Sequence, residues 1–245
     1  MDVSKKEVYD LVVSLGGNCM AANNLIRRKL RRAAMPFDWV QMSDGRVVRW
    51  LAEHVADGFA EFCLRRNLEL IPEGDPRWNR FHPERVQYFD RESGYLFYNH
   101  FNRPLDVSGE YERVYSVLRR RLDRFMASLD RADSALLVLA TFVQLRDEDL
   151  LVLEEAFRGR FPKVAFRFVV MRFSAECNCV RKLGRGIEVR EIVRGVNPYD
   201  FFMTNYEWAY LDDVDTREPR FRRPSALSRM MRRIFRLFAG KRLMV

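Results

Sequence analysis

Short apolar runs rich in β-branched residues alternate with amphipathic helical patterns along most of this chain of 245 residues. Such runs are typical of buried strands, and helices between them indicate right-handed crossovers in a parallel sheet. The pattern therefore predicts an α/β fold with three layers, a mainly parallel sheet with helices on both faces. The predicted strands are 8–15, 95–101, 135–142, 164–171 and 187–193, the predicted helices are 19–30, 45–62, 110–129 and 148–157, and residues 66–94 are expected to form loops and short strands.

The net charge of +9 comes from the C-terminal end of the chain. Residues 217–242 hold ten Lys or Arg residues against one acid, Glu218, whereas the charges of residues 1–216 balance. A nucleic-acid-binding domain more often spreads basic residues over its fold, so no nucleic-acid partner is expected. We divide the chain into an α/β domain, residues 1–215, and a basic tail, residues 216–245.

The tail has the pattern of an amphipathic helix. From Leu227 onward, apolar residues recur at helical spacing, and arginines occupy the rest of the turn. This pattern is typical of helices that lie on an anionic membrane surface, and a helix docked on the domain would show it as well. No secretory signal and no membrane-spanning run is evident, so we expect a cytoplasmic protein that the tail holds at the inner membrane face.

The four cysteines do not form a disulfide or metal pattern. They are few for the chain length, and a reduced environment is expected without an export signal. Cys177 and Cys179 are separated by Asn178, but tetrahedral zinc requires two further ligands, and none occurs at suitable spacing. No metal and no cofactor are therefore expected.

Cys19 is the candidate reactive residue. It follows the first predicted strand and the turn Gly16-Gly17, and Asn18 is suited to cap the next helix. Backbone N–H groups and the dipole at a helix N-terminus favour a thiolate, so we expect a lowered pKa for Cys19. The same N–H groups could bind the oxyanion of an acyl-transfer intermediate. A small cysteine that only packs behind the strand is the alternative.

Two motifs carry a family resemblance. Residues 14–19, SLGGNC, are followed by Pro36-Phe37-Asp38-Trp39, and a later His-Phe pair is His100-Phe101. The first two segments resemble the SLGxNC…PFDW signature of the bacterial domain family DUF1796, which is named for a papain-like cysteine peptidase, and the His-Phe pair is similar to a His-Asp-Phe motif of that family. The resemblance covers roughly residues 8–215 and implies a cysteine nucleophile at Cys19. It also raises an alternative fold, the papain-like α+β arrangement.

The partners of Cys19 follow from the inventory of suitable side chains. A general base has to lie within hydrogen-bond distance of the thiol and be oriented by a third group. We favour His100, at the end of a predicted strand, over His82 as the base. Asp38 is the leading orienting group, with Asn102 and Asp200 as alternatives, and Gly17 and Asn18 are candidates for oxyanion or substrate binding.

These residues support three functional hypotheses. The first is a thiol-dependent hydrolase or acyl-transfer enzyme of the papain-like cysteine peptidase type, acting on a peptide, ester or acyl-bearing substrate through a thioester at Cys19. The second is an acyltransferase or other accessory enzyme of surface-polysaccharide biosynthesis. The third, from a different class, is a non-catalytic binding module that retains the fold.

Overall fold

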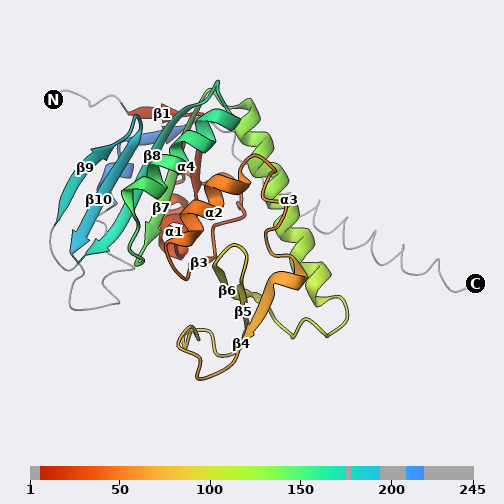
Figure 1. The fold of residues 1–245 in the computed structure, drawn as a ribbon. Coiled ribbons are helices and arrows are strands. Elements are labelled where there is room, and N and C mark those ends of the chain that lie inside the picture. The colour runs from red at the N-terminus through yellow and green to blue at the C-terminus, as the bar shows by residue number, and fades with distance from the viewer. Residues whose placement is uncertain (1–5, 175–177, 194–207, 218–245) are drawn as a thin grey trace, which may run out of the picture.

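A central sheet of five strands organises the fold (Figure 1). The computed structural model describes residues 6–174, 178–193 and 208–217. The sheet order is β2-β7-β8-β10-β9, and only the edge strand β9 runs antiparallel to its neighbour. The mixed α/β class and the predicted parallel neighbours are thus confirmed. The strands are β2 (Leu11–Ser14), β7 (Ser134–Thr141), β8 (Ala165–Ser174), β10 (Ile187–Val193) and β9 (Cys179–Leu183).

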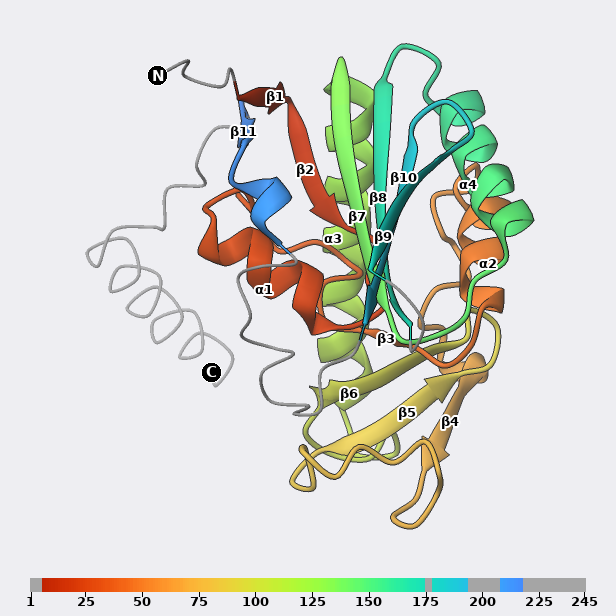
Figure 2. The same cartoon turned by 90° about the vertical axis from the view of Figure 1, so that its left-hand side faces the viewer.

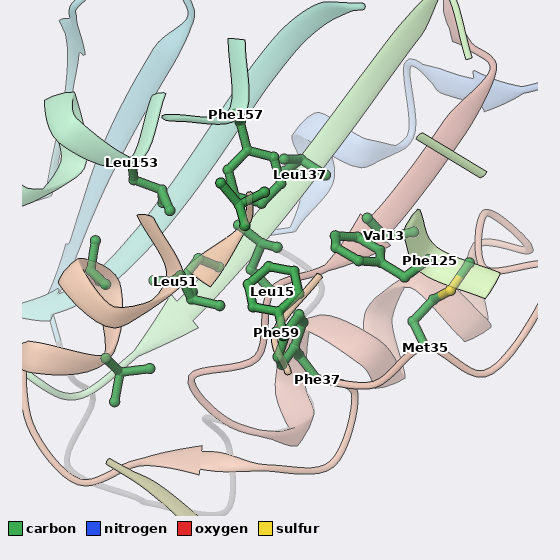
Figure 3. Close-up of a cluster of buried hydrophobic side chains, with 14 of the residues drawn as sticks. Val13, Leu15, Met35, Phe37, Leu51, Phe59, Phe125, Leu137, Leu153 and Phe157 are labelled. Atoms are coloured by element: carbon green, nitrogen blue, oxygen red, sulfur yellow. The ribbon is translucent and has the colours of Figure 1, made fainter. Parts of the chain in front are cut away.

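Helices pack against the two faces of this sheet (Figures 1 and 2). Alternate side chains of β2 point to opposite faces, as expected for a strand. Val13 packs with the side chains of α2, α3 and α4, whereas Val12 packs with those of α1. Figure 3 shows Leu137 beside Phe157, and Val13 beside Phe125, in the first of these clusters. The helices are α1 (Cys19–Arg27), α2 (Arg46–His54), α3 (Glu110–Arg131) and α4 (Asp147–Arg160).

A second, antiparallel sheet lies next to the end of the central sheet at which β2 terminates (Figure 2). Two hydrogen bonds join the sheets: the Tyr95 hydroxyl donates to the carbonyl of Leu15 at 3.0 Å, and Met42 N–H donates to the carbonyl of Gly17 at 3.2 Å. The sequence indicated only loops and short strands for most of this region. Its order is β3 (Gln41–Met42), β6 (Tyr95–Phe101), β5 (Val86–Asp90) and β4 (Leu68–Ile71).

The first predicted strand is interrupted at Asp10. Its carboxylate accepts hydrogen bonds from the N–H groups of Asp133 and Ser134, both at 3.0 Å, and the chain turns there. The preceding residues form β1 (Glu7–Tyr9), which pairs in parallel with β11 (Val214–Thr216) in a separate two-stranded sheet. The proposed boundary after residue 215 falls inside β11, and the division into domain and tail remains a prediction.

Two predicted helices are shorter than their patterns indicated. The segment from 19 to 30 ends as a helix at Arg27, and Lys29 has a positive φ of 60°. The segment from 45 to 62 ends at His54, because Gly58 and Phe59 turn the chain with φ angles of 67° and 59°. Two short 3-10 helices, Arg65–Asn67 and Ala209–Leu211, complete the elements of the described residues. Across the described ranges, no helix has the length and apolar character that a bilayer crossing demands.

Candidate active site

The turn after β2 requires glycine at two consecutive positions. Gly16 and Gly17 have φ angles of 86° and 92°, in the left-handed region. A Cβ atom on Gly17 would lie 2.1 Å from the carbonyl oxygen of Ala140, so the turn packs directly on the end of β7. The residues that follow are thereby placed at the carboxyl ends of the parallel strands, where open α/β sheets bind ligands.

Asn18 and Cys19 begin helix α1. Asn18 is the N-cap, and its Oδ1 accepts a hydrogen bond from the N–H of Met20 at 2.8 Å. This bond fixes the orientation of the amide, and its Nδ2 is buried with no hydrogen-bond partner among the described residues. Cys19 is the first residue of the helix and is partly buried. The predicted cap is confirmed, and an unpaired amide donor precedes the thiol in the chain.

The Cys19 thiol is not activated by its position at the helix start. Burial raises its pKa above the ordinary value, and the N–H of Cys19 itself opposes the shift with a smaller effect. The lowered pKa that we expected is therefore wrong, because loss of solvent outweighs the stabilisation of the thiolate by the helix end. At neutral pH the thiol is protonated, and a nucleophilic role requires a base.

His100 lies on β6 in the second sheet and faces two arginines. Its ring Nδ1 is buried and has no hydrogen-bond partner in the described part of the chain. Burial, together with the charges of Arg121 and Arg113, lowers the pKa of His100 to about 3. Arg113 also donates a hydrogen bond to the backbone carbonyl of His100 at 2.9 Å. The imidazole is therefore neutral at pH 7 and only weakly basic.

Asp38 is fully buried in the turn that precedes β3. Its Oδ2 accepts hydrogen bonds from Arg31 Nε at 2.8 Å and from Met35 N–H at 2.7 Å. Burial raises the pKa of Asp38 despite the opposing charge of Arg31. These contacts close the loop between α1 and β3, so the carboxylate has a structural role of its own. Its second oxygen, Oδ1, is buried without a partner among the residues described.

Phe37 joins the two sequence motifs. Its ring stacks on Tyr95 with centroids 5.7 Å apart, and its carbonyl oxygen would lie 3.0 Å from a Cβ atom placed on Gly16. Aromatic pairs of this kind contribute about 0.5–1.5 kcal/mol beyond burial. The motif residues 14–19 and 36–39 thus form one packed unit, and Figure 3 shows Phe37 beside Leu15.

The structure groups the predicted site residues in two sets. Gly17, Asn18 and Cys19 are consecutive at the carboxyl edge of the sheet. His100 shares a cavity with Trp39, the residue after Asp38, and both His100 and Asp38 face the charge of Arg121. Within the described residues, no hydrogen bond or ring contact joins Cys19 to His100 or to Asp38. Their assembly into one catalytic group remains a prediction.

The alternative residues have other surroundings. The backbone of His82 accepts a hydrogen bond from Gln87 Nε2 at 3.1 Å, and the N–H of Asn102 donates to Glu110 at 2.6 Å. Asp200 and Cys177 lie outside the described residues. Cys179 is an exposed residue of β9, and the described residues contain no cluster of side chains suited to a metal ion.

A cavity of about 580 Å³ lies between the start of α2 and the segment after β7. Its walls carry charges of both signs that are largely paired with one another, as between Arg146 and Asp149 at 2.8 Å. Asp44, which lines the cavity, is two residues after Met42, whose N–H donates a hydrogen bond to the Gly17 carbonyl. One wall of the cavity is therefore close in sequence to the residue that binds the glycine turn. The charged walls offer polar contacts to a substrate.

Sequence reasoning missed Arg113 and Arg121. Both project from α3 toward β6, and Arg113 forms an ion pair with Glu110 at 2.6 Å. Arg113, Val117 and Arg121 recur at every fourth position, which places them on one face of the helix. This spacing indicates a shared helix face from the sequence alone. It does not indicate which strand that face packs against.

These features define an α/β protein with a cysteine at the helix start that follows the first strand of a mainly parallel sheet. A family model described as "Putative papain-like cysteine peptidase (DUF1796)" matches residues 10–175, which is more than half of the chain. The chain therefore belongs to this family, and the expected resemblance is confirmed. Neither the curated proteins nor the solved structures include a match to the chain.

Proposed function

We propose that the chain is a thiol-dependent enzyme of the papain-like cysteine peptidase type, with Cys19 as nucleophile. The Cys19 sulfur bonds to the carbonyl carbon of a peptide or ester, and the carbon–nitrogen or carbon–oxygen bond breaks. The leaving amine or alcohol takes the proton that the thiol gave up. Water then hydrolyses the thioester, which releases a carboxylic acid and regenerates the thiol.

The buried, unpaired Nδ2 of Asn18 is the observation that carries this proposal. An acyl-transfer intermediate develops negative charge on oxygen, and a fixed N–H donor stabilises that charge. The cap bond to Met20 holds the amide in one orientation before substrate arrives. Gly17 has no side chain to obstruct the approach of a carbonyl to this donor.

The mechanism also needs a general base that takes the proton of the Cys19 thiol. His100, oriented by Asp38, is the base that the sequence indicates, and its neutral imidazole can accept a proton. Its pKa of about 3 makes it a weak base at neutral pH. It also faces Arg113 and Arg121, so a catalytic role requires His100 and Cys19 to approach one another.

The proposed catalytic unit is a three-layer α/β domain, residues 1–215. Packing of α1 on one face of the central sheet and of α2, α3 and α4 on the other supports this arrangement. The rival from another class is a non-catalytic binding module. The raised pKa of Cys19 favours that rival, because an unactivated thiol is what a structural cysteine would show.

A matched set of variants tests the proposal. The purified chain is assayed against peptide, ester and acyl-coenzyme A panels, with intact mass measured for a thioester adduct. Cys19→Ala should abolish both turnover and adduct. Asn18→Ser keeps an oxygen that caps the helix but removes the amide donor, so folding should persist while turnover falls by about 10²–10³-fold.

The panels also separate the rival functions. Transfer from acyl-coenzyme A to a sugar acceptor, without hydrolysis of peptides, would favour an acyltransferase of surface-polysaccharide biosynthesis. Turnover that survives in Cys19→Ala would overturn the role of the thiol. Absence of turnover in every arm, with no adduct on Cys19, would favour the binding module.

A further inference from the structure

A cavity of about 190 Å³ lies between α3 and β6, and we call it the α3–β6 cavity. Its polar lining includes His100, Arg113 and Arg121, and its walls include Trp39 and the apolar Leu118. Its lining residues do not include the glycine turn or Cys19. The cavity therefore combines positive charge with apolar walls, and it shares the candidate base His100, but not Cys19, with the proposed catalytic group.

The positive charge at this cavity is only partly balanced by acids. Arg113 is neutralised by Glu110, with nitrogen–oxygen distances of 2.6 and 2.9 Å. Arg121, in contrast, forms no hydrogen bond and no ion pair with any described residue. The acid that faces it is Asp38, which is already bonded to Arg31. Burial lowers the pKa of Arg121 and outweighs the opposing charge of Asp38, and the neighbouring arginines lower the pKa further.

His100 adds a second polar group that lacks a partner. The ring Nδ1 is buried, and an unsatisfied buried polar atom costs about 1–3 kcal/mol. A ligand oxygen that accepted a hydrogen bond from this imidazole would remove that cost. Its negative charge would also offset the repulsion between the guanidinium groups around Arg121.

Trp39 supplies a flat apolar wall next to these donors. Its ring is partly exposed, and the guanidinium of Arg31 lies over it, 5.8 Å from the ring centroid. Indole and leucine surfaces favour a ligand with a compact apolar or planar body. The site therefore offers a charged contact at one place and an apolar contact at another.

We propose that the α3–β6 cavity binds an oxyanion, the phosphate or carboxylate group of a small ligand, with Arg121 and His100 as its direct contacts. Arginine presents a planar fork of N–H donors that fits both groups. Asp38 holds Arg31 and the loop that carries Trp39, so it positions the site without touching the anion. This binding does not depend on acyl transfer by Cys19.

The test is a titration of the full chain with inorganic phosphate and, separately, with acetate, at ionic strength held constant with sodium chloride. Binding is followed by tryptophan fluorescence, in which Trp39 is the reporter, and by the ring proton signals of the histidines. The chain has only three histidines, so their signals are separable. A saturable fluorescence change with a shift of the His100 signal, and none at His54 or His82, is expected for at least one of the two anions.

Arg121→Gln should weaken this binding at least tenfold. Arg119→Gln is the matched control on the same helix, because Arg119 pairs with Asp123 at 3.3 Å and does not line the cavity. Trp39→Phe should remove the fluorescence response and leave the His100 shift. If Arg121→Gln unfolds, Arg121→Lys, which keeps the charge but loses the fork, should weaken binding measurably.

The two anions distinguish the ligand classes. Saturation by phosphate alone assigns a phosphate-bearing ligand, and saturation by acetate alone assigns a carboxylate. No saturable response to either anion would overturn the proposal, as would equal binding by wild type and Arg121→Gln. The readout is binding without turnover, so its failure and the failure of the proposed enzymatic activity are separate results.

Discussion

At Cys19, the position at the helix start lowers the pKa of the thiol, whereas burial of the side chain raises it. Burial dominates and raises the pKa, so the reactive thiolate is scarce at neutral pH. Alkylation by iodoacetamide should therefore be slow at pH 7, and its rate should still be rising above pH 9. Peptide mass spectrometry resolves the individual cysteines. The exposed Cys179 should react faster at pH 7, and the buried Cys63 should be protected until the protein unfolds.

Faster alkylation of Cys19 than of Cys179 at pH 7 would contradict this expectation. It would mean that a base approaches the thiol in solution. Addition of a denaturant provides the control, since it should equalise the rates by exposing all of the cysteines.

The imidazole of His100 makes stability depend on pH. Its folded pKa of about 3 lies below the unfolded value of about 6.5, so the unfolded state binds the proton first as pH falls. Stability is therefore greatest above pH 6.5 and is lost toward pH 3. Linkage gives a loss of about 2 kcal/mol between pH 7 and pH 5. Urea unfolding of wild type and of His100→Asn at these two pH values measures this loss of stability.

The variant should lose less stability than wild type over that interval, because asparagine does not titrate. Asp38 and the other acids contribute equally to both proteins, so their effect cancels in the difference. Identical pH dependence of the two proteins would show that His100 is more exposed to solvent than its buried Nδ1 indicates.

The sequence predicted residue positions better than residue chemistry. Asn18 is the N-cap and Cys19 opens the helix, as the local pattern indicated. The pKa of Cys19 depends on burial by tertiary packing, which no local pattern contains. The same limit applies to Arg121, whose environment arises only when α3 meets β6 and the turn at Trp39.

Among the elements, the glycine turn after β2 gives the sharpest stability prediction. Gly17→Ala would place a methyl group 2.1 Å from the Ala140 carbonyl oxygen, with the backbone at a φ of +92°. Gly74 has a nearly equal φ of +94° but open space around it, so Gly74→Ala is a matched control for backbone strain. Gly74→Ala should cost about 1 kcal/mol and Gly17→Ala about 3 kcal/mol or more. Urea denaturation of both variants gives the comparison.

Equal losses would show that the turn can move away from β7 and that backbone strain alone explains the glycine. A larger loss in Gly17→Ala would show that close packing fixes this turn. Thermal melts of the same proteins provide a second measurement of which variant loses more stability.

The ends of elements were less predictable than their centres. β6 and β10 coincide with the predicted segments 95–101 and 187–193. The segment from 45 to 62 has a helical pattern throughout, but its helix ends at His54. Asp57 Oδ1 accepts a hydrogen bond from the N–H of Phe59 at 2.9 Å, and Phe59 then points into the core. The pattern was correct about which residues are buried and wrong about the backbone that buries them.

For the whole molecule, alternation of strands and helices predicted the central sheet but not the second one. Strands β4 and β5 are four and five residues long and lie among Pro, Gly and Asp residues. Strand β3 is only two residues long, and it pairs with β6 across more than fifty residues of chain. Long-range pairing of short strands leaves little local signal. The strand order therefore emerges only from the complete fold.

The C-terminal end gives the last prediction, which rests on the sequence because residues 218–245 lie outside the described residues. Apolar residues on one helical face oppose Arg229, Arg232, Arg233 and Arg236. Each basic residue near an anionic leaflet contributes about 1 kcal/mol. The full chain should therefore bind anionic vesicles in a salt-sensitive manner and should not bind zwitterionic ones. Replacing the four arginines with glutamine should weaken binding by about 10²–10³-fold. Co-sedimentation measures both.

The structure decides where a truncated control has to end. Thr216 pairs with Tyr9 in the sheet of β1 and β11, and the N–H of Arg217 donates to the Tyr9 carbonyl at 2.8 Å. A truncation after Asp215 would remove both contacts and confuse lost binding with lost folding. A truncation after Arg217 keeps β11 whole and removes only the basic segment. Vesicle binding by this shorter chain at the wild-type level would exclude the tail as a membrane anchor. A docked tail would instead appear as a lower melting temperature of the shorter chain, with no vesicle binding by either protein.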